Sequence, residues 1–145
     1  MIKSRYSEVV SGVIIADLIT MSEDLAEAAC HCKDYHAYAT FEHLGLERRR
    51  IALQMLREAR GLGCSPCCKA ESGLRNVQKA FAHFFRRDWF VGLEPAERRL
   101  GRRFKAALFD PALEPNIKAV IHHAFEAAAP GRDLEYFARR NRSLD

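Results

Sequence analysis

Two groups of cysteine and histidine side chains are the residues of this chain whose types and spacing could do chemistry. One group lies within residues 30–36 and the other within residues 64–68. Thiolate sulfur and imidazole nitrogen are ligands of zinc, copper and iron, so either group could hold a soft metal. The candidate metal ligands are Cys30, Cys32, His36, Cys64, Cys67 and Cys68.

The Cys-x-x-Cys spacing of Cys64 and Cys67 is also that of redox dithiols. A thioredoxin-type motif belongs beside a βαβ pattern, and no strand is predicted before this loop, so that assignment fails on context. Cysteine also packs as a small apolar side chain. We therefore expect packing for Cys30 and Cys32, and either incidental loop thiols or a redox or metal role for residues 64–68.

Glu97 is the carboxylate that a helical count places toward the core. At roughly 100° per residue it lies about 20° from Phe104 on the apolar stripe of its helix, and Arg48 falls on the inward stripe of an earlier helix. A buried carboxylate must be paired or protonated. We expect Glu97 to form a structural ion pair with Arg48, or to lie near the more solvent-accessible end of the bundle. A lone metal-binding or catalytic carboxylate is the alternative.

The standard di-iron site of four-helix bundles is not expected. Such sites take a Glu from each of two helices and a Glu-x-x-His pair from each of the other two. No glutamate in this chain is followed by histidine at that spacing. On the first helix, Glu23 and Glu27 are predicted to face solvent.

Two histidines have a glutamate four residues later. His122 precedes Glu126, and His43 precedes Glu47. Residues at this spacing are neighbours on a helix, so each pair could ligate a metal. We expect both to be solvated hydrogen-bonded pairs.

Helices must position these groups, because apolar residues recur at three- and four-residue intervals along most of the chain. Asp34 is the expected N-cap of the second helix, and Gly92 with Glu94-Pro95 is expected to separate the third from the fourth. Pro130-Gly131 either breaks the last helix or separates a short final one within residues 130–145. The predicted helices cover residues 9–32, 35–62, 74–92, 95–109 and 115–129.

The first two helices, each about 35 to 40 Å long at the standard rise, are joined by a short turn and must lie antiparallel. The sequence thus predicts one domain over residues 1–145, with residues 1–10 as a candidate arm. Its fold class is all-α, an antiparallel four-helix bundle with an extra short helix in the crossover. The two cysteine groups would then lie at opposite ends of the second helix, so a shared site would need a symmetry mate.

Several short segments of the chain match one helical family. They are Asp17-Leu18-Ile19, Glu27-Ala28-Ala29, Glu47-Arg48, Leu62-Gly63 before Pro66, Glu97-Arg98, Phe104-Lys105-Ala106-Ala107-Leu108 and Pro115. On these segments the chain resembles a ferritin-like helical family known as domain of unknown function 2383. The resemblance covers most of residues 12–128 and implies a four-helix bundle with no established activity. The cysteine-rich loop 64–68 and Pro130-Gly131 depart from the family pattern.

The composition limits the cellular compartment and the kinds of partner that we expect. The net charge is +4, with arginine-rich runs near residues 48–60, 86–87, 98–103 and 139–142. Arginine suits phosphate, so nucleic acid is a possible partner, but interspersed glutamates favour a solvated helical face. No apolar run is long enough to span a bilayer. Five cysteines, an odd number, fit reduced thiols in the cytoplasm better than a disulfide framework.

These observations favour a non-catalytic helical bundle that acts by association, as a homo-oligomer. No Gly-rich phosphate loop and no Gly-x-Ser-x-Gly motif are present, so an enzyme is the least supported class. One alternative is a metal-binding or thiol-redox protein that uses the loop at residues 64–68. The other is a basic bundle that associates with nucleic acid.

Overall fold

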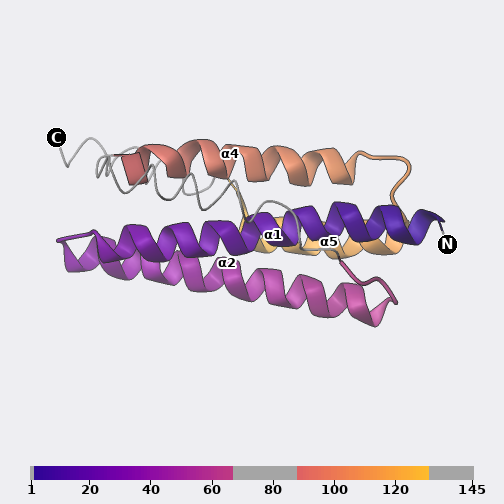
Figure 1. The fold of residues 1–145 in the computed structure, drawn as a ribbon, viewed down its shortest axis with the longest axis horizontal. Helices are drawn as coiled ribbons and strands as arrows, with labels where there is room; N and C mark the ends of the chain where they lie inside the picture. The colour runs from indigo at the N-terminus through magenta and orange to yellow at the C-terminus, as the bar shows by residue number, and fades with distance from the viewer. Residues whose placement is uncertain (1, 67–87, 131–145) are drawn as a thin grey trace.

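Helices make up most of what the computed structural model describes, which is residues 2–66 and 88–130. They are α1 (Ile2–Cys30), α2 (Tyr35–Gly61), α4 (Asp88–Leu108) and α5 (Pro115–Ala128), and no strand occurs among these residues (Figure 1). The all-α prediction is confirmed for this part of the chain. Residues 2–10, the candidate arm, are the first turns of α1.

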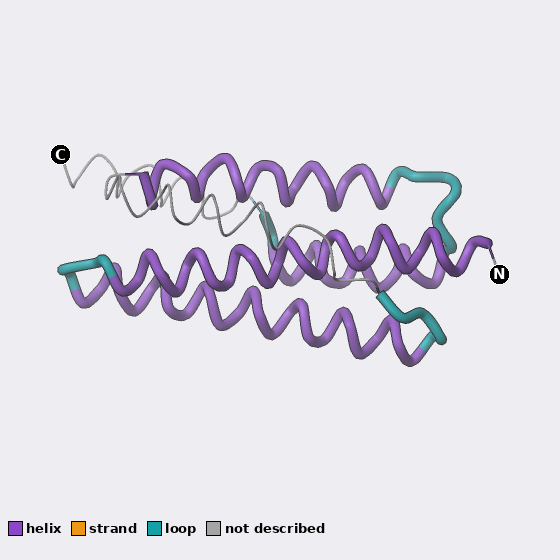
Figure 2. The backbone as a smooth tube through the Cα atoms, in the orientation of Figure 1, coloured by secondary structure: helices purple, strands orange, loops and turns teal. Residues whose placement is uncertain are grey.

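α1 and α2 form the predicted antiparallel hairpin, side by side along their length (Figure 2). Asp34 caps α2 as expected, since its side chain accepts a hydrogen bond from the backbone N–H of His36 at 3.1 Å. Gly45 lets the two helices approach closely. A Cβ atom there would lie 3.0 Å from the carbonyl oxygen of Ser22. The absence of a side chain at residue 45 therefore sets the spacing of the hairpin.

The break predicted at Gly92 is wrong, because α4 continues through Gly92 and Pro95. Proline removes one backbone hydrogen bond and crowds the preceding turn. Tertiary packing outweighs this cost, since buried side chains on one face hold the helix from Leu93 to Ala107. Most of the predicted third helix, residues 74–92, lies outside the described residues. The buried residues of this face are Leu93, Glu97, Leu100, Phe104 and Ala107.

The core consists of two groups of buried side chains. The larger group joins all four helices and includes Leu18, Met55, Phe104 and Ile121. The smaller group lies nearer the α1–α2 turn and is centred on residues such as Phe41. α5 runs from Pro115 to Ala128, close to the predicted range. None of the helices described is long and apolar enough to cross a membrane.

Candidate functional site

A buried ion pair joins α2 to α4. Nη2 of Arg48 contacts the Glu97 carboxylate, and the two side chains are only 5% and 1% exposed. Nη1 of the same arginine donates to the backbone carbonyl of Ala128, at the end of α5. The predicted inward positions and their pairing are confirmed. Because the guanidinium engages a carboxylate that is sealed from solvent, this geometry ties three helices together.

The first cysteine group lies at the α1–α2 turn. Cys30 and His36 are exposed, so the packing predicted for Cys30 is wrong. Cys32 is partly buried, and its Sγ donates to the carbonyl oxygen of Ala28 at 3.2 Å. Within residues 2–66 and 88–130, no three His, Cys, Asp or Glu side chains gather closely enough to hold a metal ion. These candidate ligands therefore form no metal cage with other described residues.

Cys64 is the described member of the second group, and Cys67 and Cys68 lie outside the described residues. Its thiol is 4% exposed, and its sulfur lies 3.9 Å from Oγ of Ser11. Desolvation by burial raises the pKa of Cys64, so the unreactive thiol form is favoured over the thiolate. Cys64 follows α2, and Cys32 precedes it. They are separated by roughly 40 Å of helix, as the hairpin requires.

The two predicted histidine pairs are present on the surface. Nε2 of His122 lies 3.4 Å from the Glu126 carboxylate, and Nε2 of His43 lies 3.6 Å from that of Glu47. All four side chains are more than a third exposed. The spacing prediction is confirmed, and such exposed pairs contribute little to stability.

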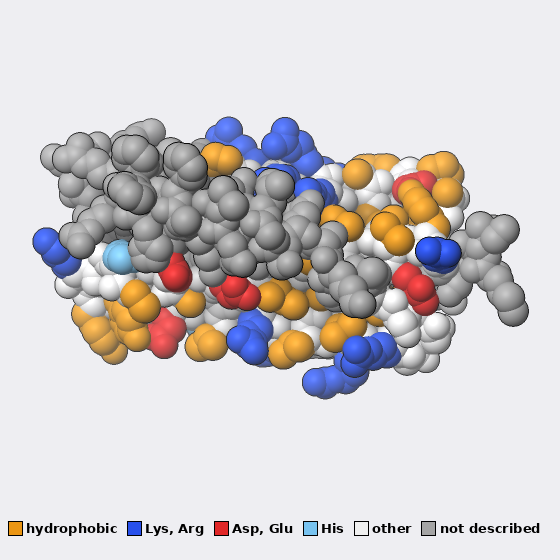
Figure 3. All heavy atoms as spheres, in the orientation of Figure 1, with side chains coloured by type: hydrophobic (Ala, Val, Ile, Leu, Met, Phe, Trp, Pro, Cys, Tyr) orange, Lys and Arg blue, Asp and Glu red, His pale blue; other side chains and the backbone are white. Residues whose placement is uncertain are grey.

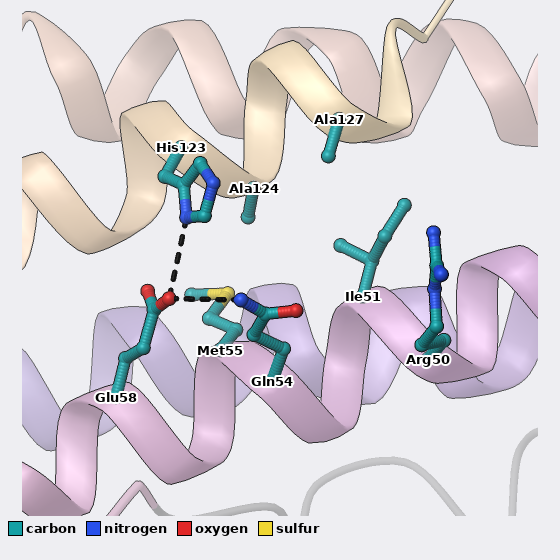
Figure 4. Close-up of a pocket in the computed structure, with 8 residues that line it drawn as sticks. All are labelled: Arg50, Ile51, Gln54, Met55, Glu58, His123, Ala124 and Ala127. Carbon is teal, nitrogen blue, oxygen red and sulfur yellow. Dashed lines mark hydrogen bonds and ion pairs between the residues drawn. The ribbon is translucent and has the colours of Figure 1, made fainter.

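A pocket of about 180 Å³ lies between α2 and α5 (Figure 4). Sequence reasoning missed it. One end is polar: Oε1 of Glu58 accepts a hydrogen bond from Nε2 of Gln54 at 3.2 Å and lies 3.2 Å from Nδ1 of His123. Because a carboxylate can only accept, Nδ1 of this histidine carries the hydrogen. The pocket is lined by Arg50, Ile51, Gln54, Met55 and Glu58 of α2 and by His123, Ala124 and Ala127 of α5.

The other end of the pocket carries a cation. In Figure 4, Arg50 projects beyond Ile51 at the end opposite the Glu58–His123 pair, and apolar side chains lie between the two ends. The Arg50 guanidinium lies 3.8 Å from the Glu47 carboxylate on the same helix. The pocket thus has an apolar floor, with the Arg50 guanidinium at one end and the Glu58-bound imidazole of His123 at the other.

The solvent face of α2 carries exposed leucines. Leu46 and Leu53, seven residues apart, are 65% and 47% exposed. They share one stripe with charged side chains, because offsets of four, seven, eleven and fifteen residues fall on one helical face. In Figure 3, hydrophobic side chains alternate with acidic and basic ones along α2. We call this surface the α2 stripe and define it as Glu42, Leu46, Arg49, Leu53 and Arg57.

The arginines of these runs lie in different environments. Arg48 is buried in its ion pair, and Arg103, which is partly buried, lies 2.5 Å from the carboxylate of Asp17 on α1. Arg49 and Arg57 are exposed on the α2 stripe. A run that reads as one basic patch in sequence is therefore divided between the core and the surface.

Comparisons of the chain with protein-family models, curated proteins and solved structures find no match. The function is therefore argued from the geometry of these surfaces.

Proposed function

We propose that this protein acts by association, as a homodimer whose two copies pair through the α2 stripe. The observation that carries the proposal is the exposure of Leu46 and Leu53 on the solvent face of a long helix. Apolar side chains repeated at this spacing between charges are typical of helix-pairing surfaces. Burial raises the pKa of the Cys64 thiol and so disfavours a redox role for this residue.

An antiparallel pairing of two α2 helices matches the charges as well as the leucines. When the two-fold axis passes between Arg49 and Arg50, Leu46 of each copy faces Leu53 of the other. The same axis places Glu42 of each copy opposite Arg57 of the other. Each contact therefore occurs twice, as in an isologous interface. The two Arg49 side chains meet near the axis, and this like-charge contact weakens the pairing.

The expected dimer is weak. The stripe from Glu42 to Arg57 is about 22 Å long at the helical rise. A contact of one helix against another at this length falls below the standard interface of about 800 Å² per partner. We therefore expect a Kd on the order of 10 μM, which suits a reversible association.

Sedimentation velocity between 1 and 200 μM tests the dimer. Leu53→Glu should leave a monomer throughout this range, because it buries a charge against leucine. Leu62→Glu is the matched control: Leu62 is 49% exposed but lies off the stripe, so this variant should dimerise normally. A wild-type protein that stays monomeric at 200 μM, or a dimer that survives Leu53→Glu, would contradict the proposal.

Charge variants test the register of the pairing. Glu42→Arg or Arg57→Glu alone should weaken the dimer, and the double exchange should restore it, because both pairs then have opposite charges again. Arg49→Gln should tighten the dimer by removing the central repulsion. Failure of the double exchange to restore dimerisation would exclude this antiparallel register.

We also propose that the bundle is ferritin-like, as the resemblance to domain of unknown function 2383 implies. In support, α4 and α5 pack against the α1–α2 hairpin. The proposal requires a helix in the crossover between α2 and α4, where residues 67–87 lie outside the described part. Backbone chemical shifts for residues 74–87 test it. Helical values are expected, and extended values would contradict the ferritin-like connection.

We place this association in the cytoplasm, where thiols stay reduced. Five cysteines, an odd number, cannot all pair within one chain, and Cys30, Cys32 and Cys64 form no disulfide with one another. Thiol titration of protein purified without reductant or chelator, together with elemental analysis, tests this setting. Five free thiols and no bound metal are expected, whereas stoichiometric zinc, copper or iron would favour the metal-binding alternative.

A further inference from the structure

We infer that the pocket between α2 and α5 is a binding site for a small monocarboxylate with a compact apolar body. The pocket lies on the side of α2 that faces α5, and Arg50 is its residue that borders the α2 stripe. Three features of the pocket carry the inference: its volume, its exposed cation and its polar end.

The volume suits one small ring or short chain. The pocket measures about 180 Å³, and an apolar cavity of about 150 Å³ is enough to hold benzene. Its floor is apolar, formed by Ile51 and Met55 of α2 with Ala124 and Ala127 of α5 (Figure 4). An apolar body of six to eight heavy atoms would therefore displace water from apolar surface on both helices.

The cationic end selects a carboxylate. The Arg50 side chain is 77% exposed, and its guanidinium forms a loose ion pair with Glu47 at 3.8 Å. Its N–H groups can thus form the bidentate pair that carboxylates accept. Glu58 at the opposite end disfavours a second negative charge on the ligand. The combination favours a monocarboxylate over a dicarboxylate or a phosphate ester.

The polar end favours a ligand with a hydroxyl group far from its carboxylate. Glu58 fixes the His123 ring through Nδ1, so in the neutral imidazole Nε2 is an acceptor. Figure 4 shows this second ring nitrogen pointing away from Glu58. The carboxylate also holds Gln54 by its Nε2, which leaves the amide oxygen as a second acceptor. Two acceptors at this end would receive the hydrogen of a ligand hydroxyl.

Titration of the full chain with 4-hydroxybenzoate, followed by amide NMR shifts at constant ionic strength, tests the site. We expect saturable shifts at residues 123–127 with a Kd on the order of 1 mM, as suits a ligand of ten heavy atoms. Benzoate should bind more weakly and benzyl alcohol more weakly still. Shifts that stay linear to 20 mM, or equal shifts with acetate, would overturn the inference.

Matched variants separate the pocket from general charge effects. Arg50→Gln should weaken binding by about tenfold through loss of a charge-assisted pair, whereas Arg102→Gln, an exposed arginine on α4, should not. Ala127→Leu should fill the pocket and abolish binding. Ala119→Leu, an equivalent change at an exposed position of α5, should preserve it. Binding that resists both pocket variants would place the ligand elsewhere.

The ligand site and the dimer can fail separately. Leu53→Glu, the variant expected to be monomeric, should bind 4-hydroxybenzoate as the wild type does. Loss of binding in this variant, with its fold intact by circular dichroism, would show that the pocket needs the second copy and would overturn the inference of an independent site.

Discussion

Replacing Glu97 with glutamine should strongly destabilise the bundle. The substitution keeps the side-chain volume but leaves the Arg48 guanidinium charged and 5% exposed, without its carboxylate. Removing one partner of a buried ion pair costs about 3–5 kcal/mol, because the remaining charge stays desolvated. The total free energy of unfolding of a domain is about 5–15 kcal/mol. A single amide for carboxylate exchange should therefore remove about a third of the stability.

Urea denaturation followed by circular dichroism measures this loss. With a slope of about 2 kcal/mol/M, the midpoint should fall by about 2 M. Glu126→Gln is the matched control: it is the same substitution on a helix, but the His122–Glu126 pair lies within one helix and is more than half exposed. Its effect should stay within about 0.5 kcal/mol. If Glu97→Gln costs no more than this control, the buried pair is not the tie that we describe.

An apolar replacement of both partners separates charge burial from packing. Arg48→Met combined with Glu97→Leu should recover most of the stability lost in Glu97→Gln, since no unpaired charge remains. Recovery should be incomplete, because Arg48→Met also removes the donor to the carbonyl of Ala128. Nε of Arg48 has no acceptor among the described residues, so the double change also removes one unmet donor. A double variant less stable than Glu97→Gln would contradict this account.

Three further predictions concern other parts of the fold. In variants that keep one cysteine, Cys64 should react with a thiol reagent at least about tenfold more slowly than Cys30, because it is buried and its pKa is raised. The Tyr6 hydroxyl donates to Asp110, which raises the pKa of Tyr6 above 10.0 and lowers that of Asp110 below 3.8. Urea denaturation should therefore show the wild type to be more stable than Tyr6→Phe, with the full difference between pH 4 and pH 10. The difference should be lost as pH falls through the lowered pKa of Asp110, and also as pH rises through the raised pKa of Tyr6. Gly45→Ala should cost about 1–3 kcal/mol by the same assay, although alanine favours helices, because its Cβ meets the backbone of α1 at 3.0 Å; an unchanged midpoint would refute this close approach.

The helices and the inward direction of key side chains could be predicted from sequence, because both follow from periodicity within one element. Glu97 and Arg48 each fall on an apolar stripe, so their burial follows from counting residues. The continuation of α4 through Pro95 could not be predicted, because local rules favour a break there. Packing of residues on both sides of this proline, such as Leu93 and Leu100, decides the outcome and is not visible in local sequence.

The pocket could not be predicted by counting residues along one helix. The His122–Glu126 pair could be predicted from a spacing of four residues, whereas His123 contacts Glu58, which is 65 residues away in the sequence. Which residue of α5 lies opposite which residue of α2 depends on the axial position of one helix against the other. Sequence periodicity gives the face of a helix and not this axial position.

The buried ion pair supplies the missing information about α5. Arg48 donates to the carbonyl of Ala128, so the end of α5 is held at a defined height on α2. Since the two helices run antiparallel, this contact places earlier residues of α5 beside later residues of α2. His123 then lies opposite Glu58, and Ala127 lies near Arg50 at the other end of the pocket. The carboxylate of Glu97 orients the same guanidinium from α4. A structural pair predicted from helical faces thus sets the register that forms the surface pocket.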